Sequence, residues 1–184
     1  MKNRAFTLLE ITVVISIIII LSTIFIANYR AGEKNFTLQR SAHQLAQDLR
    51  KVQEMAMAGQ EFDETFPKGG YGIHFKEDYS SYYLFADCDG DGEFDETGDI
   101  FINCSEAVPE NPCPETIEEI YLEENISIFS LSPVSGEGTL EITFFPPDPR
   151  VTINPLSSTA SITLTNGQIE KTITINSVGL IDVQ

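Results

Sequence analysis

Residues 6–27 of the chain, FTLLEITVVISIIIILSTIFIA, decide the expected fold. No charged residue occurs between Ile11 and Ala27, and the basic residues Lys2 and Arg4 precede the run. As a helix, 6–27 would span about 33 Å at about 1.5 Å per residue, enough for the hydrocarbon core of a bilayer. The sequence therefore predicts a transmembrane helix with its basic N-terminus in the cytoplasm and the rest of the chain outside.

Glu10 is the one acidic residue in this stretch, and it separates three interpretations. A cleaved secretory signal needs small residues at a cleavage site after the run, and Phe25 to Arg30 fit this badly. A plain membrane anchor explains the length of the run but not the acid. A carboxylate in a membrane costs about 2.5–3.5 kcal/mol at mid-helix, so Glu10 calls for a partner.

The segment Ala5-Phe6-Thr7-Leu8-Leu9-Glu10 resembles the class III signal of type IV pilins and pseudopilins. The resemblance implies that prepilin peptidase cuts between Ala5 and Phe6, where the family usually has Gly before the cut. Phe6 would become the N-methylated first residue, and Glu10 the glutamate at the fifth mature position. The new amine of one subunit could pair with Glu10 of the next and set axial register during assembly. The alternative is an unpaired carboxyl near the membrane interface.

An amphipathic segment follows the apolar run. Apolar residues recur at helical spacing, as one stripe that we expect to pack on the chain's own domain: Leu38, Ala42, Leu45, Leu49, Val52 and Ala56. Gly59 is typical of a helix C-cap. The segments 41–56 and 173–183 are similar to the corresponding segments of the GspH/FimT branch of the pilin superfamily. This branch includes FimT-type minor pilins and the minor pseudopilin H of type II secretion.

Charge divides the chain near Gly59. Of 11 basic and 28 acidic residues, residues 1–59 hold 7 and 4, a net charge of +3; residues 60–184 hold 4 and 24, a net charge of −20. The sequence thus predicts a leader over 1–5, a helix over 6–59 (6–28 transmembrane and filament core, 29–59 amphipathic), and an acidic β-rich domain over 60–184. The balance argues against a nucleic-acid partner, which needs a basic face.

Apolar and polar residues alternate in short runs after Gly59, and Asn166-Gly167 is a strong hairpin signal. The expected strands are 71–76, 82–86, 100–104, 117–122, 126–131, 140–145, 161–165, 171–176 and 180–183. The predicted fold class is α+β: a long N-terminal transmembrane or assembly helix followed by a sandwich-like antiparallel sheet, as the pilin resemblance also implies.

The stretch 87–99, DCDGDGEFDETGD, has seven acids and no base. Alternate carboxylates can converge on Ca²⁺ where Gly92 lets the chain turn, as in DxDxDG loops of EF-hand-like sites. The expected ligands are Asp87, Asp89, Asp91 and Asp95 with the Glu93 carbonyl. Gly98 stands where a bidentate Glu is expected, so Asp99 or Glu96 would substitute. The alternative is a solvated acidic hairpin tip. No organic cofactor motif occurs.

Three cysteines leave one unpaired. We expect a disulfide between Cys104 and Cys113, which are close in sequence and flank a Pro-rich loop, with Cys88 free; pairings that involve Cys88 stay open. No Cys–His arrangement suggests a nucleophile, and no paired nucleophile and base is visible, so an enzyme is not expected.

The sequence as a whole predicts a structural subunit, a minor pilin or pseudopilin of a type IV pilus or of a type II secretion-like filament. It would sit in the inner membrane with its C-terminal domain outside, then join a cell-surface pilus or periplasmic pseudopilus. The implied partners are other subunits, prepilin peptidase, the inner-membrane assembly platform and membrane lipid. Two alternatives are a membrane-anchored calcium-binding adhesion protein that does not polymerise, and a FimT-like pilin for DNA uptake, which the charge disfavours.

Overall fold

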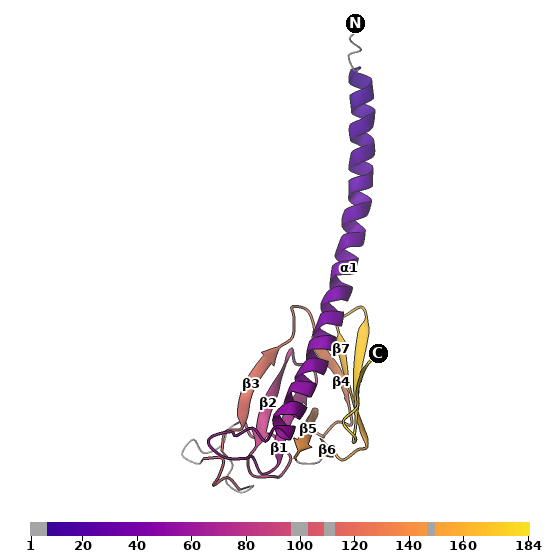
Figure 1. The fold of residues 1–184 in the computed structure, drawn as a ribbon. Helices are drawn as coiled ribbons and strands as arrows, with labels where there is room; N and C mark the ends of the chain where they lie inside the picture. Colours follow the sequence, from indigo (N-terminus) through magenta and orange to yellow (C-terminus); the bar gives the residue numbers. More distant parts are fainter. Residues whose placement is uncertain (1–6, 97–102, 109–112, 147–149) are drawn as a thin grey trace. The chain divides into compact units, whose positions relative to one another are not determined.

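A computed structural model describes residues 7–96, 103–108, 113–146 and 150–184, with the side chains of 24–32 left out. The chain divides into two compact units, 1–36 and 37–184. The elements are drawn in Figure 1. They are α1 (Leu8–Met57), β1 (Gly70–Lys76), β2 (Ser81–Asp87), β3 (Thr116–Tyr121), β4 (Ser127–Ser132), β5 (Thr139–Phe145), β6 (Arg150–Asn154), β7 (Thr159–Thr165), β8 (Glu170–Asn176) and β9 (Ile181–Val183).

Two antiparallel sheets make up most of the second unit. One has five strands in the order β3-β2-β1-β5-β6, and the other has four in the order β4-β7-β8-β9. The hairpin predicted at Asn166-Gly167 is confirmed: it joins β7 to β8, which pair over their whole length, and Gly167 has a φ of 81°. Such a positive φ suits glycine because it has no Cβ.

The core of this unit lies between the second half of α1 and the inward faces of the sheets. The apolar stripe predicted on this helix is confirmed, because every residue from Leu38 to Ala56 in the stripe is at most 1% exposed. It belongs to one buried cluster with Ile73 of β1, Leu84 of β2 and Ile162 of β7. A stripe at helical spacing meets alternate residues of strands here, as the two periodicities require.

Polar contacts reinforce this packing at the edge of the core. The Tyr82 hydroxyl of β2 donates to the Asp48 carboxylate of α1 at 2.6 Å. Lys51 of α1 pairs with Glu118 of β3 at 2.9 Å, and Arg40 pairs with Glu123. The basic face of the helix is therefore matched by acids of the β-rich part, although such exposed ion pairs add little stability each.

Eight of the nine predicted strands overlap an observed one. The ninth, 100–104, lies mostly outside the described residues, and its described part, 103–104, is not a strand. Strand β6 was not predicted from the sequence. It is a five-residue edge strand in which exposed and buried residues alternate, and Pro155 follows it.

The predicted transmembrane helix is wrong. Within the part of the chain that the structure describes, no helix is both long and apolar enough to cross a membrane. A crossing takes about 20 consecutive, mostly apolar residues. The fold class is corrected accordingly, to a structure of mostly antiparallel sheets without a membrane-spanning helix in its described residues.

Two further predictions that rested on this span are also wrong. The location as a single-pass inner-membrane protein with its C-terminal domain outside the cytoplasm is not supported, because the span is not found in the described residues. The prediction that the chain is a membrane-inserted subunit of a type IV pilus or a secretion pseudopilus loses its support for the same reason.

Candidate functional site

The acidic loop, residues 87–96, begins at the end of β2 and is held against the outward face of the five-stranded sheet. Phe94 is its anchor. The Phe94 ring stacks on Tyr83 with a centroid distance of 5.2 Å and lies 5.4 Å from Phe85, both of β2. It also lies 4.9 Å from the ring of His74 in β1. Aromatic contacts at these distances stabilise beyond the burial of area, so the loop has a fixed place on the sheet.

Backbone N–H groups turn the loop around the Asp87 carboxylate. One carboxylate oxygen of Asp87 accepts from the N–H of Gly90 at 2.7 Å and the other from that of Gly92 at 3.0 Å. Both glycines have a positive φ, 87° and 80°, which confirms the sharp turn predicted at Gly92 and adds Gly90. Asp89 and Asp91 each accept an N–H two residues further along the chain. The spacing of acids and glycines therefore encodes the turn itself.

Carboxylates converge inside this turn. Ligand oxygens of Asp87, Asp89 and Asp91 all lie within 4.8 Å of one another, as do those of Asp89, Asp95 and Glu115. Asp89 belongs to both groups. Its Oδ2 atom is buried and has no hydrogen-bond partner among the described residues. A buried, unsatisfied carboxylate oxygen among other carboxylates lacks compensation, unless a cation supplies it.

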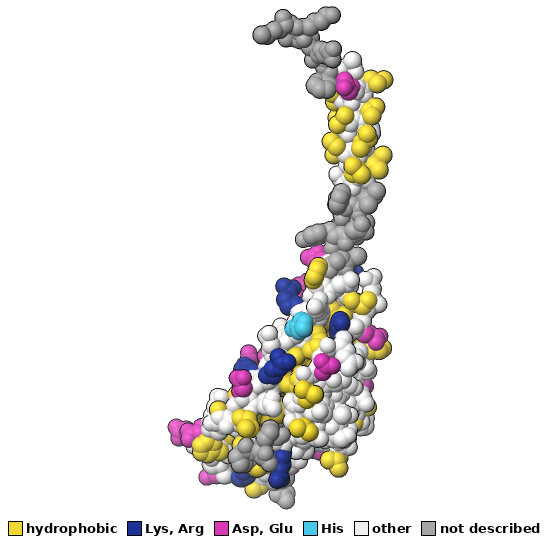
Figure 2. All heavy atoms as spheres, turned by 45° about the vertical axis from the view of Figure 1, so that its right-hand side comes forward, with side chains coloured by type: hydrophobic (Ala, Val, Ile, Leu, Met, Phe, Trp, Pro, Cys, Tyr) yellow, Lys and Arg dark blue, Asp and Glu magenta, His cyan; other side chains and the backbone are white. Residues whose placement is uncertain are grey.

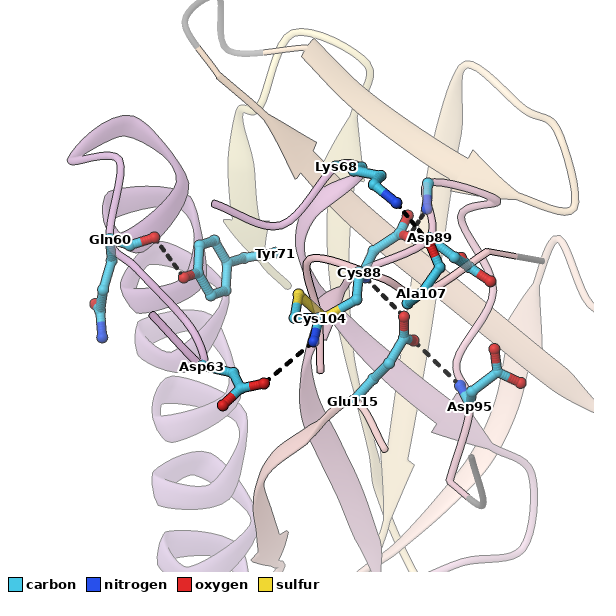
Figure 3. The surroundings of a disulfide bond; sticks show 12 residues. Gln60, Asp63, Lys68, Tyr71, Cys88, Asp89, Asp95, Cys104, Ala107 and Glu115 are labelled. Carbon is cyan, nitrogen blue, oxygen red and sulfur yellow. Dashed lines mark hydrogen bonds between the residues drawn. A yellow bond between two sulfur atoms is a disulfide. The ribbon is translucent and has the colours of Figure 1, made fainter. Parts of the chain in front are cut away.

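Glu115 is the member of the cluster that sequence reasoning missed. It stands just before β3, is 0% exposed, and accepts the N–H of Cys88 at 2.7 Å and that of Asp95 at 3.3 Å (Figure 3). The pairing of β3 with β2 brings it under the acidic loop. Sequence reasoning could not connect Glu115 with the acidic loop, because the two are far apart in the sequence. The local signal is an acid directly after Pro114 at the start of a strand.

Burial without a counter-charge shifts the proton affinity of these groups. Desolvation raises the pKa of Glu115 from 4.5 to about 8; the N–H groups of Cys88 and Asp95 oppose the rise, and the charge of Asp87 adds to it. Desolvation likewise raises the pKa of Asp87 from 3.8 to about 7, against the N–H groups of Gly90 and Gly92. The pKa of Asp95 is raised too, by burial and then by the charge of Asp89.

The predicted ligand set is thus partly brought together. Asp87, Asp89, Asp91 and Asp95 line the cluster. The Glu93 side chain accepts from Asn154 Nδ2 at 3.4 Å, and the prediction that the Glu93 carbonyl is a ligand stays a prediction. Asp99 lies outside the described residues. Hard oxygen donors in this number suit Ca²⁺, which takes six to eight of them in flexible geometry. The residues present fit such an ion.

The predicted Cys104–Cys113 disulfide is wrong: the bond joins Cys88 to Cys104, and Cys113 is a buried free thiol. Contacts from a distant segment explain the difference, as Figure 3 shows. The Asp63 carboxylate accepts the N–H of Cys104 at 3.1 Å, and Lys68 Nζ donates to the Ala107 carbonyl at 2.5 Å. These contacts fold 103–107 back over the end of β2.

The second region with functional predictions is the start of α1. Ala5 and Phe6, the predicted processing residues, lie outside the described residues. Glu10 lies in the first turn of α1, where its N–H is bonded to the carbonyl oxygen and Oγ1 of Thr7. Thr7 and Glu10 have the spacing of a capping box, so Glu10 also has a local role at the positive end of the helix. Glu10, Ile11, Val14 and Ile15 line a shallow apolar groove.

Comparison of the chain with protein-family models, with curated proteins and with solved structures finds no match.

Proposed function

We propose that this protein is a structural subunit that assembles into a filament through the N-terminal part of α1, in the manner implied by its resemblance to pilins and pseudopilins. The observation that carries the proposal is the exposure of the aliphatic side chains on the described part of this segment. On the side in view, Figure 2 shows apolar side chains along this segment, with an acidic side chain near its start.

The exposure is large for residues of this type. Leu8 is 86% exposed and Leu9 74%, and each aliphatic residue from Ile11 to Leu21 is about half exposed or more. Covering half of an Ile or Leu side chain is worth roughly 2 kcal/mol at 25 cal/mol per Å². A helix that is hydrophobic all round belongs in a buried place, and side-by-side packing with the same segment of other subunits supplies one.

Glu10 makes the packing specific. A carboxylate on an apolar surface is costly to bury alone, and mismatching a buried charge pair costs more than forming it gains. Cleavage before Phe6 by a prepilin-type peptidase would supply an amine as its partner on the neighbouring subunit. The net charge of −17 favours protein subunits over nucleic acid as partners.

The test replaces Glu10 with Val in the full chain and follows incorporation into filaments by electron microscopy and sedimentation. Thr12→Val is the matched control, since it changes a polar residue of the same helix turn to the same apolar one. We expect Glu10→Val to be lost from filaments and Thr12→Val to be retained. Equal assembly of both variants, or a native N-terminus at Met1 by mass spectrometry, would refute the proposal.

A second candidate function rests on the acidic loop: we infer that it binds Ca²⁺ and that the ion fixes the loop on the sheet. The supporting observation is the buried, unpartnered Oδ2 of Asp89 between two groups of carboxylates. Asp89, Asp95 and Glu115 would hold the ion. Asp91 and Asp87 lie beside them, and the Asp87 oxygens could each accept one more contact. When bound, Ca²⁺ supplies the positive charge that these buried acids lack.

Calorimetric titration of the chelator-treated protein with CaCl₂ tests this inference. Asp89→Asn removes the charge of the shared residue and keeps its shape, and Asp182→Asn, an exposed residue of β9, is the control. We expect binding by the control and a loss of affinity in Asp89→Asn. A ligand that binds only the folded state raises the free energy of unfolding, by about 2.7 kcal/mol at a free concentration of 100 times Kd. The Tm rises with it. Unchanged Tm with calcium would refute the site.

A further inference from the structure

A free thiol lies beside a disulfide to which it does not belong. The sulfur atoms of Cys88, Cys104 and Cys113 all lie within 4.8 Å of one another, and all three residues are buried. Two of them form the Cys88–Cys104 bond, and Cys113 is reduced. Neither proposed function uses this cluster. A thiol so close to a disulfide is placed to exchange with it, because exchange needs contact between the attacking sulfur and the bond.

The pairing of β2 with β3 decides which exchange fits the fold. Phe85 of β2 pairs with Thr116 of β3, and the N–H of Ala86 donates to the Glu115 carbonyl at 2.9 Å. Both strands end before these positions, but the same antiparallel register, continued by two residues beyond the Ala86–Glu115 contact, would put Cys88 opposite Cys113. Residues directly opposite in an antiparallel pair have Cα atoms about 4.5–5.5 Å apart. That range lies within the usual Cα separation of a disulfide, about 4.4–6.8 Å.

We propose that Cys88, Cys104 and Cys113 form a disulfide-exchange site that gives the folded protein two covalent forms. In the step, the sulfur of the Cys113 thiol attacks Sγ of Cys88, and the proton of that thiol passes to the departing Cys104 sulfur. A Cys88–Cys113 bond forms, the Cys88–Cys104 bond breaks, and Cys104 leaves as a thiolate that takes up this proton. One disulfide and one thiol are present before and after, so the step needs no oxidant or reductant.

The exchange moves a cross-link from one part of the fold to another. In the form described, the bond ties the segment 103–108 to the end of β2. In the second form it ties β2 to β3, and 103–108 is held by the Asp63 and Lys68 hydrogen bonds to Cys104 and Ala107. Cys88 keeps its N–H bond to Glu115 in both. The site therefore regulates the attachment of 103–108, and it does not depend on filament assembly.

Disulfide mapping of the full chain tests the proposal. The native protein is incubated in a reduced and oxidised glutathione buffer without denaturant, quenched with acid, alkylated after unfolding and digested for mass spectrometry. We expect a Cys88–Cys113 peptide together with alkylation of Cys104, besides the original pair. Alkylation of Cys113 alone, under conditions in which a urea-unfolded sample scrambles all three, would overturn the proposal.

Single variants separate exchange within the folded state from chance reoxidation. Cys113→Ser should keep Cys88–Cys104 and show no second form in the same buffer. Cys104→Ser should close Cys88–Cys113 with an unchanged far-ultraviolet spectrum. A Cys104→Ser protein that folds but keeps two free thiols in oxidising buffer would refute the predicted register. Should this variant not fold, the mapping of the unmodified chain decides alone.

Discussion

Replacement of Glu115 by Gln should flatten the dependence of stability on pH. Folding raises the pKa of this carboxyl from 4.5 to about 8, so the folded state holds its proton more tightly than the unfolded state. Its contribution is fully present below pH 4.5 and is lost as the pH rises through about 8. The calcium-free protein should therefore become less stable over this window.

The size of the loss follows from the same shift. A tenfold change in proton affinity is worth about 1.4 kcal/mol, so the shift of Glu115 sets a ceiling of about 5 kcal/mol. Water reaching the ionised group lowers this to about 2–3 kcal/mol between pH 5 and 8. Gln keeps the shape and neutrality of the protonated acid, but its amide NH₂ cannot accept the second of the two backbone N–H groups that Glu115 binds. Glu115→Gln should therefore start about 1 kcal/mol below the wild type at pH 5 and lose less stability than the wild type up to pH 8.

Urea unfolding in chelator at a series of pH values measures this difference. Asp87, whose pKa is raised to about 7, leaves a residual slope in the variant. Glu124→Gln, an exposed acid in the turn before β4, is the control and should follow the wild type. A Glu115→Gln protein with the wild-type slope between pH 5 and 8 would show that Glu115 ionises freely in the folded protein, contrary to the reasoning from its burial.

Three other substitutions test the packing around the acidic loop and in the core. Phe94→Ala should cost about 2 kcal/mol in urea unfolding by removing the loop's aromatic anchor, whereas Phe66→Ala, 61% exposed, should cost under about 0.5 kcal/mol; equal costs would contradict the anchor. Gly69→Ala should weaken calcium binding in calorimetry, because its Cβ would overlap the Asp87 carboxylate; unaltered affinity would count against that geometry. Leu45→Ala should cost about 2–5 kcal/mol, since Leu45 is fully buried, and a smaller loss would mean that the helix stripe packs loosely.

Local patterns predicted much of the β-rich part. Alternation located eight strands to within a few residues, and Asn166-Gly167 located the β7–β8 hairpin. The helical stripe from Leu38 to Ala56 predicted its own burial. These features depend on residues a few positions apart, where backbone preference and side-chain period act together.

The membrane prediction failed at the same level of reasoning. The prediction rested on the length of the apolar run 6–27, and Glu10 was expected to need a partner on another subunit. In the structure Glu10 and Thr7 belong to the start of a helix, where an acid is favoured by the free N–H groups of the first turn. No span is found in the described residues.

The sequence by itself determined the acidic loop, its glycine turns and the stripe that packs α1, because these depend on neighbouring residues. Only the tertiary structure decided that Glu115 completes the carboxylate cluster and that Cys104 bonds Cys88. The place of Glu115 depends on the pairing of β3 with β2. The Cys88–Cys104 bond depends on the hydrogen bonds from Asp63 and Lys68, which hold the distant turn that contains Cys104. Pairings across such separations leave no local pattern, since the residues that meet are not neighbours in the sequence.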